Sequence, residues 1–219
     1  MSRVPFPDVT GRRLRAPSRT SFAGDGMASL GHASMNATNI TWKDLHEAAQ
    51  DFGVSPRAII SAAWGYVLYL YVTHECDSVA FDAVDADTCV AISFGPSLCR
   101  WEDPISMVQL SEKAWLSDRH VQIHGPVLFV SAPDQDTQSA LSLAESTLSR
   151  TDSSLSLVFI AHQAHTSTSS SSSHPVALTL LASPSVHIHG SAMTQLAQVE
   201  HVLHALVHRL DLTKCIPTE

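Results

Sequence analysis

The feature that most limits how this chain can fold is an uncharged stretch, residues 58–72, that is apolar except for Ser61 and Gly65. Apolar side chains would lie on nearly every side of a helix formed by this stretch, so such a helix has no polar face to turn toward water. A membrane-spanning helix needs about 20 predominantly apolar residues, and this stretch is shorter. We therefore predict a helix at the centre of a globular domain, with Trp64 buried in its core.

Local signals define where this helix and a shorter one before it begin and end. Ser55 stands where a helix N-cap is expected, and Pro56 follows at the first helical position, where its missing N–H has no cost. Upstream, apolar residues at 45, 48, 49 and 52 recur at helical spacing, and Gly53 follows them. The sequence predicts two consecutive helices, with ordered structure beginning near Thr41.

Strands and helices alternate in the remainder of the chain. Short apolar segments bounded by turn residues indicate strands, and Asp103 followed by Pro104 indicates a helix start. The predicted strands are 78–81, 89–94, 127–130, 155–161, 176–181 and 186–189, and the further helices begin at Pro104, lie near 141–148 and cover 191–210. This order predicts an α/β fold, an α+β sandwich in which a mixed sheet is covered by helices.

Two segments differ in composition from the packed domain, which we place at residues 41–212. Residues 1–40 contain several prolines, glycines and arginines without apolar periodicity, which predicts a disordered leader. Residues 166–174 are almost entirely serine and threonine, which predicts a flexible loop within the domain.

Charge and cysteine content exclude several classes of protein. Lys and Arg total 13 against 21 Asp and Glu, a net charge of −8, which argues against binding to nucleic acid or to an anionic membrane. The four cysteines include no CxxC pair, so no zinc knuckle or thioredoxin-like site is predicted. No apolar signal-peptide core follows Met1, and we expect reduced thiols and a cytoplasmic location.

Three of the 13 histidines share one face of the last predicted helix. His201, His204 and His208 are spaced i, i+3 and i+7, so they lie within about 60° of one another around the helix. Neutral imidazoles on one face can bind zinc, but no carboxylate lies within their arc to orient a ring. The sequence favours a solvent-facing stripe over a metal site.

Other histidines are explained by ordinary strand alternation. His187 and His189 fall on one face of a strand, and His162 and His165 precede the serine-rich segment. Neither set has the HExxH spacing that supplies two metal ligands and a base. We predict no metal site from them.

The run DAVDADTC, which contains Asp82, Asp85 and Asp87, superficially resembles the start of an aspartate-nucleophile phosphatase. Cys89 stands where a threonine or valine is wanted, and no partner lysine motif follows, so an acidic solvated loop is the prediction. The chain also has no GxSxG elbow, Walker loop, GxGxxG or deaminase signature. The motifs therefore indicate no catalytic, cofactor-binding or metal-binding residue, and no cofactor.

Residues 51–83, DFGVSPRAIISAAWGYVLYLYVTHECDSVAFDA, resemble the opening of the C-terminal lobe of condensation domains in nonribosomal peptide synthetases. Asp82 replaces the usual glycine. Residues 92–100 are similar to a shortened vGPxxNTxPxR segment, 106–127 to the helix that follows it, and 177–210 to the closing strands and helix. The matching positions in the first segment are Gly53, Val54, Ala62, Ala63, Trp64, Leu68, Tyr71, Val79 and Phe81. The resemblance implies one lobe of a chloramphenicol-acetyltransferase-like fold, in the CoA-dependent acyltransferase-like superfamily.

The departures from that pattern concern the chemistry. The family's HHxxxDG motif, whose second histidine acts at the acceptor nucleophile, is absent from these residues, and so is the asparagine of the GPxxNT segment. The resemblance thus implies a truncated or degenerate lobe of a secondary-metabolism synthetase, inactive alone and structural or docking in role. Its expected partners are an N-terminal condensation lobe, an adenylation domain or a phosphopantetheinyl carrier domain. The alternative is a divergent acyltransferase that forms an amide or ester from a carrier- or CoA-bound acyl group, with His120 or His162 as the base.

Overall fold

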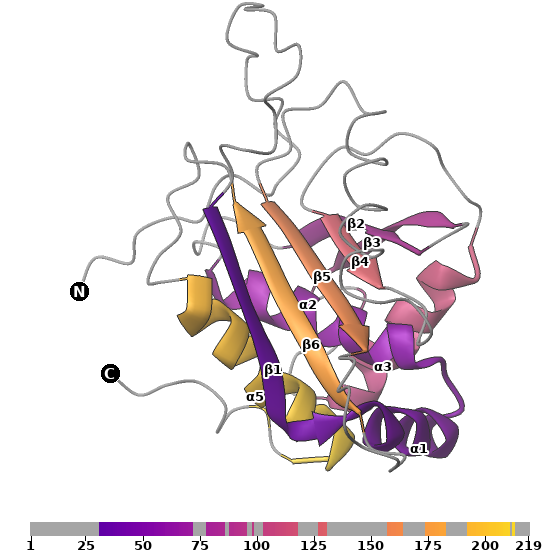
Figure 1. Cartoon of the computed structure of the whole chain (residues 1–219). Coiled ribbons are helices and arrows are strands. Elements are labelled where there is room, and N and C mark those ends of the chain that lie inside the picture. Colours follow the sequence, from indigo (N-terminus) through magenta and orange to yellow (C-terminus); the bar gives the residue numbers. More distant parts are fainter. Residues whose placement is uncertain are drawn as a thin grey trace, which may run out of the picture.

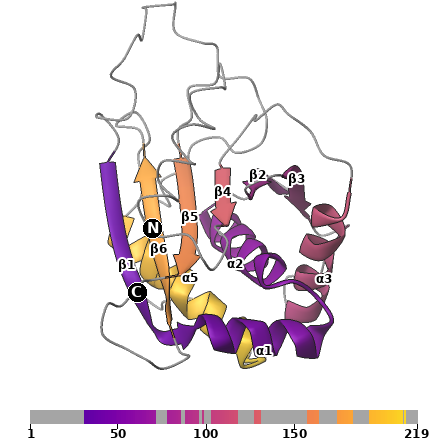
Figure 2. The same ribbon diagram turned by 45° about the vertical axis from the view of Figure 1, so that its right-hand side comes forward.

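The computed structural model describes residues 31–71, 78–85, 88–95, 98, 103–117, 127–130, 157–163, 174–182, 192–210 and 212. Their strands form one six-stranded mixed sheet, and the described helices lie on one face of it (Figures 1 and 2). In chain order the elements are β1 (Gly31–Thr41), α1 (Trp42–Phe52), α2 (Pro56–Tyr71), β2 (Val79–Val84), β3 (Cys89–Phe94), α3 (Pro104–Trp115), β4 (Val127–Val130), β5 (Leu157–Gln163), β6 (Pro175–Ala182) and α5 (Ala192–Val207).

The strand order across the sheet is β1-β6-β5-β4-β2-β3. β4 pairs in parallel with both β2 and β5, and the other neighbours pair antiparallel. This arrangement confirms the predicted α/β class with a mixed sheet covered by helices. In the part of the chain that the structure describes, no helix is long and apolar enough to cross a membrane.

Helix α2 is the central helix that the uncharged stretch predicts. Trp64 has none of its surface exposed, and its ring stacks on Phe159 of β5 with centroids 4.7 Å apart and planes 7° from parallel. A side chain at Gly65 would meet the ring of Phe94, because a Cβ built there lies 2.4 Å from Phe94 Cε2. Burial of Trp64 is confirmed, and the glycine lets the helix approach the sheet closely.

The predicted helix boundaries are confirmed where capping residues set them. Gly53 ends α1 in the left-handed conformation, with φ 67°, and Asp103 accepts a hydrogen bond from Ile105 N at the start of α3. Ser55 precedes α2 as expected, but its N–H and hydroxyl both donate to the Glu112 carboxylate of α3. This residue therefore joins two helices.

The predicted leader boundary at residue 40 is wrong for residues 31–40. These residues belong to β1, which pairs antiparallel with β6 at the edge of the sheet, and Ala37 and Ile40 are buried. Their place is determined by a strand more than 130 residues later in the chain, which local periodicity does not report. Residues 1–30, most of the serine-rich segment 166–174, the predicted helix near 141–148 and the predicted strand 186–189 lie outside the described residues.

Candidate functional site

The face of the sheet opposite the described helices is the surface on which a functional site can be sought. Phe159 contacts Trp64 on the helix side, so Ile160 lies on the other face, which we call the second face. The register places Ile160 beside Thr179 of β6, and Thr179 beside Ser34 of β1. The hydroxyls of Ser34 and Thr179 are hydrogen-bonded at 2.7 Å, so this face has polar groups between its apolar residues.

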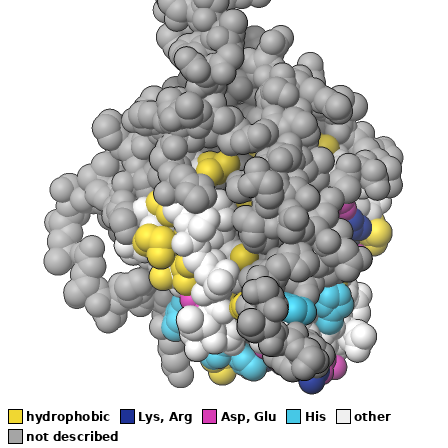
Figure 3. Space-filling view, viewed as in Figure 1, with side chains coloured by type: hydrophobic (Ala, Val, Ile, Leu, Met, Phe, Trp, Pro, Cys, Tyr) yellow, Lys and Arg dark blue, Asp and Glu magenta, His cyan; other side chains and the backbone are white. Residues whose placement is uncertain are grey.

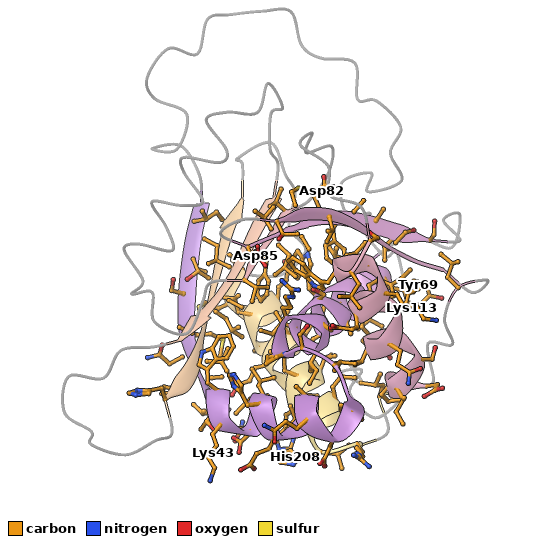
Figure 4. All side chains as sticks on the ribbon, turned by 90° about the vertical axis from the view of Figure 1, so that its right-hand side faces the viewer. Lys43, Tyr69, Asp82, Asp85, Lys113 and His208 are labelled. Atoms are coloured by element: carbon orange, nitrogen blue, oxygen red, sulfur yellow. The ribbon has the colours of Figure 1, made fainter. Side chains whose placement is uncertain are left out.

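Asp82 lies on the second face of the sheet, in β2, and is only 4% exposed. Val84 of β2 and Ile160 of β5 are aligned with the same residue of β4, so their side chains are on the same face of the sheet. Asp82 precedes Val84 by two residues and therefore shares that face. The prediction of a solvated acidic loop is thus wrong for Asp82, because β2 continues to Val84 and places this carboxylate inside the sheet. Figure 4 shows Asp82 at the opposite end of the domain from Lys43 and His208.

Cys89 of β3 is on the same face as Asp82, since it pairs with Val84. Burial raises the pKa of the Cys89 thiol to about 11, and the negative charge of Asp82 contributes in the same direction. The thiol is therefore protonated near neutral pH, and a protonated thiol is a poor nucleophile. Neighbouring exposed positions on this face, Ala80, Ala91 and Ser93, have small side chains.

Asp85, just after β2, forms an ion pair and is not part of a freely solvated loop. Its carboxylate binds the Arg57 guanidinium and accepts a 2.8 Å hydrogen bond from Thr88 N. Arg57 also lies 4.5 Å from the centre of the Trp115 ring, whose Nε1 donates to Ser61 Oγ at 3.0 Å. These contacts join α2, α3 and the β2–β3 turn, which gives Asp85 a structural role; Asp87 lies outside the described residues.

Glu200 of α5 is a buried carboxylate that the sequence reasoning did not single out. Its Oε1 accepts hydrogen bonds from Thr38 N at 2.6 Å, Thr38 Oγ1 at 3.0 Å, Asn39 N at 3.1 Å and Asn39 Nδ2 at 3.3 Å. The β1–β6 register shifts between Asn36 and Thr41, so the backbone N–H groups in this bulge do not pair with β6. The Glu200 carboxylate accepts hydrogen bonds from two of them, those of Thr38 and Asn39. The sequence does contain a signal for this burial, because Glu200 falls at helical spacing from the apolar residues Leu196 and Leu203.

The histidines of α5 lie on its outer face, as predicted. His201 and His208 are exposed and His204 is partly buried, whereas Leu196, Val199, Leu203 and Leu206 are buried. In Figure 3 the visible histidines gather at the end of the molecule where α1 and the C-terminal part of α5 lie. Within the described ranges, no group of three or more His, Cys, Asp or Glu is placed to hold a metal ion.

Of the two histidines considered as bases, only His162 is among the described residues. His162 belongs to β5 and pairs with Ala177 across the ladder, and His120 lies outside the described residues, as do His165, His187 and His189. Among the described residues the geometry thus places the buried Asp82 and the half-buried Cys89 on one sheet face, forms a structural Arg57–Asp85 ion pair, and gathers histidines on one face of α5.

Comparison with known proteins places the fold. No protein-family model matches the chain, and no curated protein matches its sequence. A nonribosomal peptide synthetase cyclization-docking bidomain (EpoB) from Sorangium cellulosum matches with a TM-score of 0.55 at 11% identity, over 81% of this chain and 41% of that one.

Two condensation domains match in the same way. That of the monacolin K polyketide synthase MokA gives a TM-score of 0.57 at 10% identity, over 97% of this chain and 55% of its own. The first condensation domain of the CDA synthetase gives 0.54 at 10% identity, over 82% and 45%. The chain thus spans about half the length of the structures it matches, and it has the fold of part of a condensation domain.

Proposed function

We propose that this chain, with the fold of half a condensation domain, is a structural or docking lobe of a cytoplasmic nonribosomal peptide synthetase system, without bond-forming activity of its own. The observation behind the proposal is the half-length match to solved condensation and cyclization domains, combined with a sequence that has no HHxxxDG.

The chemistry of the described residues supports an inactive lobe. Acyl transfer to an amine or hydroxyl is accelerated by a general base within hydrogen-bond reach of the attacking group. The second face offers Asp82 and Cys89, and the raised pKa of Cys89 works against a thiolate nucleophile. A single lobe also provides only one wall of a cleft, so it does not position two substrates against each other.

A docking role fits the exposed apolar residues around α3. Ile105 is 44% exposed and Leu116 is 73% exposed, at the two ends of this helix, and Leu98 before it is also exposed. Such exposed apolar side chains are available for contact with a partner that runs along the helix. We propose that α3 contacts the partner, which is an N-terminal condensation lobe, an adenylation domain or a carrier domain.

The test is to purify the chain with each of these three partners from the same synthetase system and to measure complex formation by light scattering after size-exclusion chromatography. We expect a one-to-one complex with at least one partner, weakened at least about tenfold by Leu116→Glu. Leu210→Glu, at an exposed leucine on another surface, is the matched control and should bind normally. No complex with any partner, or equal weakening by both substitutions, would contradict the docking proposal.

A further inference from the structure

Two histidines at the C-terminal end of α5 face each other closely. The ring centroids of His204 and His208 are 4.5 Å apart, and the ring planes are inclined by 59°. The two residues are one helical turn apart, so their side chains lie over the same strip of helix surface. His201 is on the same side and exposed.

The separation of the rings is compatible with a chelate. A metal bonded at about 2.1 Å to one nitrogen of each ring lies about 3.2 Å from each ring centre. Ligand angles of about 90° to 109° then place the ring centres about 4.5–5.2 Å apart, a range that includes the observed 4.5 Å. Imidazole suits copper and nickel, and copper stands highest in the general order of affinity of nitrogen sites for divalent ions.

The charges that face the pair from α1 have both signs. Burial alone would raise the pKa of Asp44, but hydrogen bonds from Thr41 and the charges of His208 and Lys43 outweigh it and lower the pKa. The Asp44 carboxylate is thus close enough to interact with a cation at His208, while Lys43 opposes it.

We propose that His204 and His208 chelate one divalent copper or nickel ion per chain, with water in the remaining coordination positions. The sequence alone favours a plain solvent-facing stripe, because the spacing of three histidines shows neither the distance between two rings nor the nearby carboxylate of α1. Two protein ligands predict an exchangeable site and not a permanently closed one.

The test measures NiCl₂ binding by calorimetry and by the rise in melting temperature of the full chain at pH 7.5. Removing one ligand, in His204→Ala or His208→Ala, should weaken Ni²⁺ binding at least about tenfold and abolish most of the rise. His201→Ala, which removes an exposed histidine from the same face, is the control and should respond like the unchanged chain. Since His208 is exposed, its variant should fold even where His204→Ala does not.

Two further readings complete the test. At pH 5 the Ni²⁺ response should disappear, because protons compete for both rings. Equal Ni²⁺ binding by the unchanged chain, His208→Ala and His201→Ala would overturn the proposal.

Discussion

Replacing Gly65 by alanine tests the closest contact between α2 and the sheet. The added Cβ would lie 2.4 Å from Cε2 and 2.5 Å from Cδ2 of Phe94, and 3.3 Å from Cε1 of Phe81. An ordinary carbon–carbon contact is about 3.5–4.0 Å, so the Phe94 ring or the helix must move by about 1 Å. Phe94 is fully buried and lies against Phe81, which leaves it little room to move.

The expected change in stability is the sum of two opposing contributions. Alanine favours a helix interior over glycine by about 1 kcal/mol, which would stabilise the variant. Overpacking a well-packed core costs about 1–3 kcal/mol, and a contact this short belongs at the upper end of that range. We therefore expect Gly65→Ala to lower the free energy of unfolding by about 2 kcal/mol, and the melting temperature by about 4–8 °C.

Urea unfolding followed by circular dichroism measures this change, with an unchanged m-value as the sign that both proteins unfold alike. Phe94→Leu, which shortens the opposing side chain, completes a double-mutant cycle and should recover part of the loss when combined with Gly65→Ala. If Gly65→Ala is as stable as the parent or more stable, helix propensity dominates and the close helix–sheet contact is refuted.

Three further outcomes are expected. Trp64→Ala should cost about 3–5 kcal/mol in unfolding free energy, measured by denaturant titration, because it leaves a cavity against Phe159; an unchanged melting temperature would contradict the placement of α2. Glu200→Ala should cost about 1–3 kcal/mol by leaving donors of the β1 bulge unsatisfied, and proteolysis should cleave near residue 38 faster than in the parent. Because the pKa of His204 is lowered in the folded chain, the unfolded chain binds this proton first as the pH falls, so the free energy of unfolding should decrease below pH 6.5. His204→Gln should therefore flatten the dependence of the melting temperature on pH between pH 7 and 5, and an unaltered dependence would contradict this assignment.

Sequence reasoning identified the helices well because their ends depend on local chemistry. Gly53 adopts the left-handed conformation that glycine allows, and Asp103 with Pro104 begins α3 as predicted. Strand β1 was missed for the opposite reason. It contains a bulge and polar residues, and it is held by β6 and by Glu200, both distant in sequence.

The polar residues were harder to interpret than the core. The segment DAVDADTC has a composition typical of loops, yet its first aspartate, Asp82, is a strand residue and Asp85 forms an ion pair with Arg57. Asp82 has a place on one face of the sheet only because β2 continues beyond it to Val84. The sequence prediction ended this strand at residue 81, three residues too early. The distance between His204 and His208 likewise depends on side-chain conformations that spacing alone does not fix.

The most direct test of the proposed role is an acyl-transfer assay on the purified chain. The chain is incubated with acyl-carrier or acyl-CoA donors and amine acceptors, and products are followed by mass spectrometry. A lobe without HHxxxDG should give no product above the uncatalysed rate, with an intact condensation domain as the positive control. Turnover that disappears in His120→Ala or in His162→Ala would contradict the account and identify a working acyltransferase.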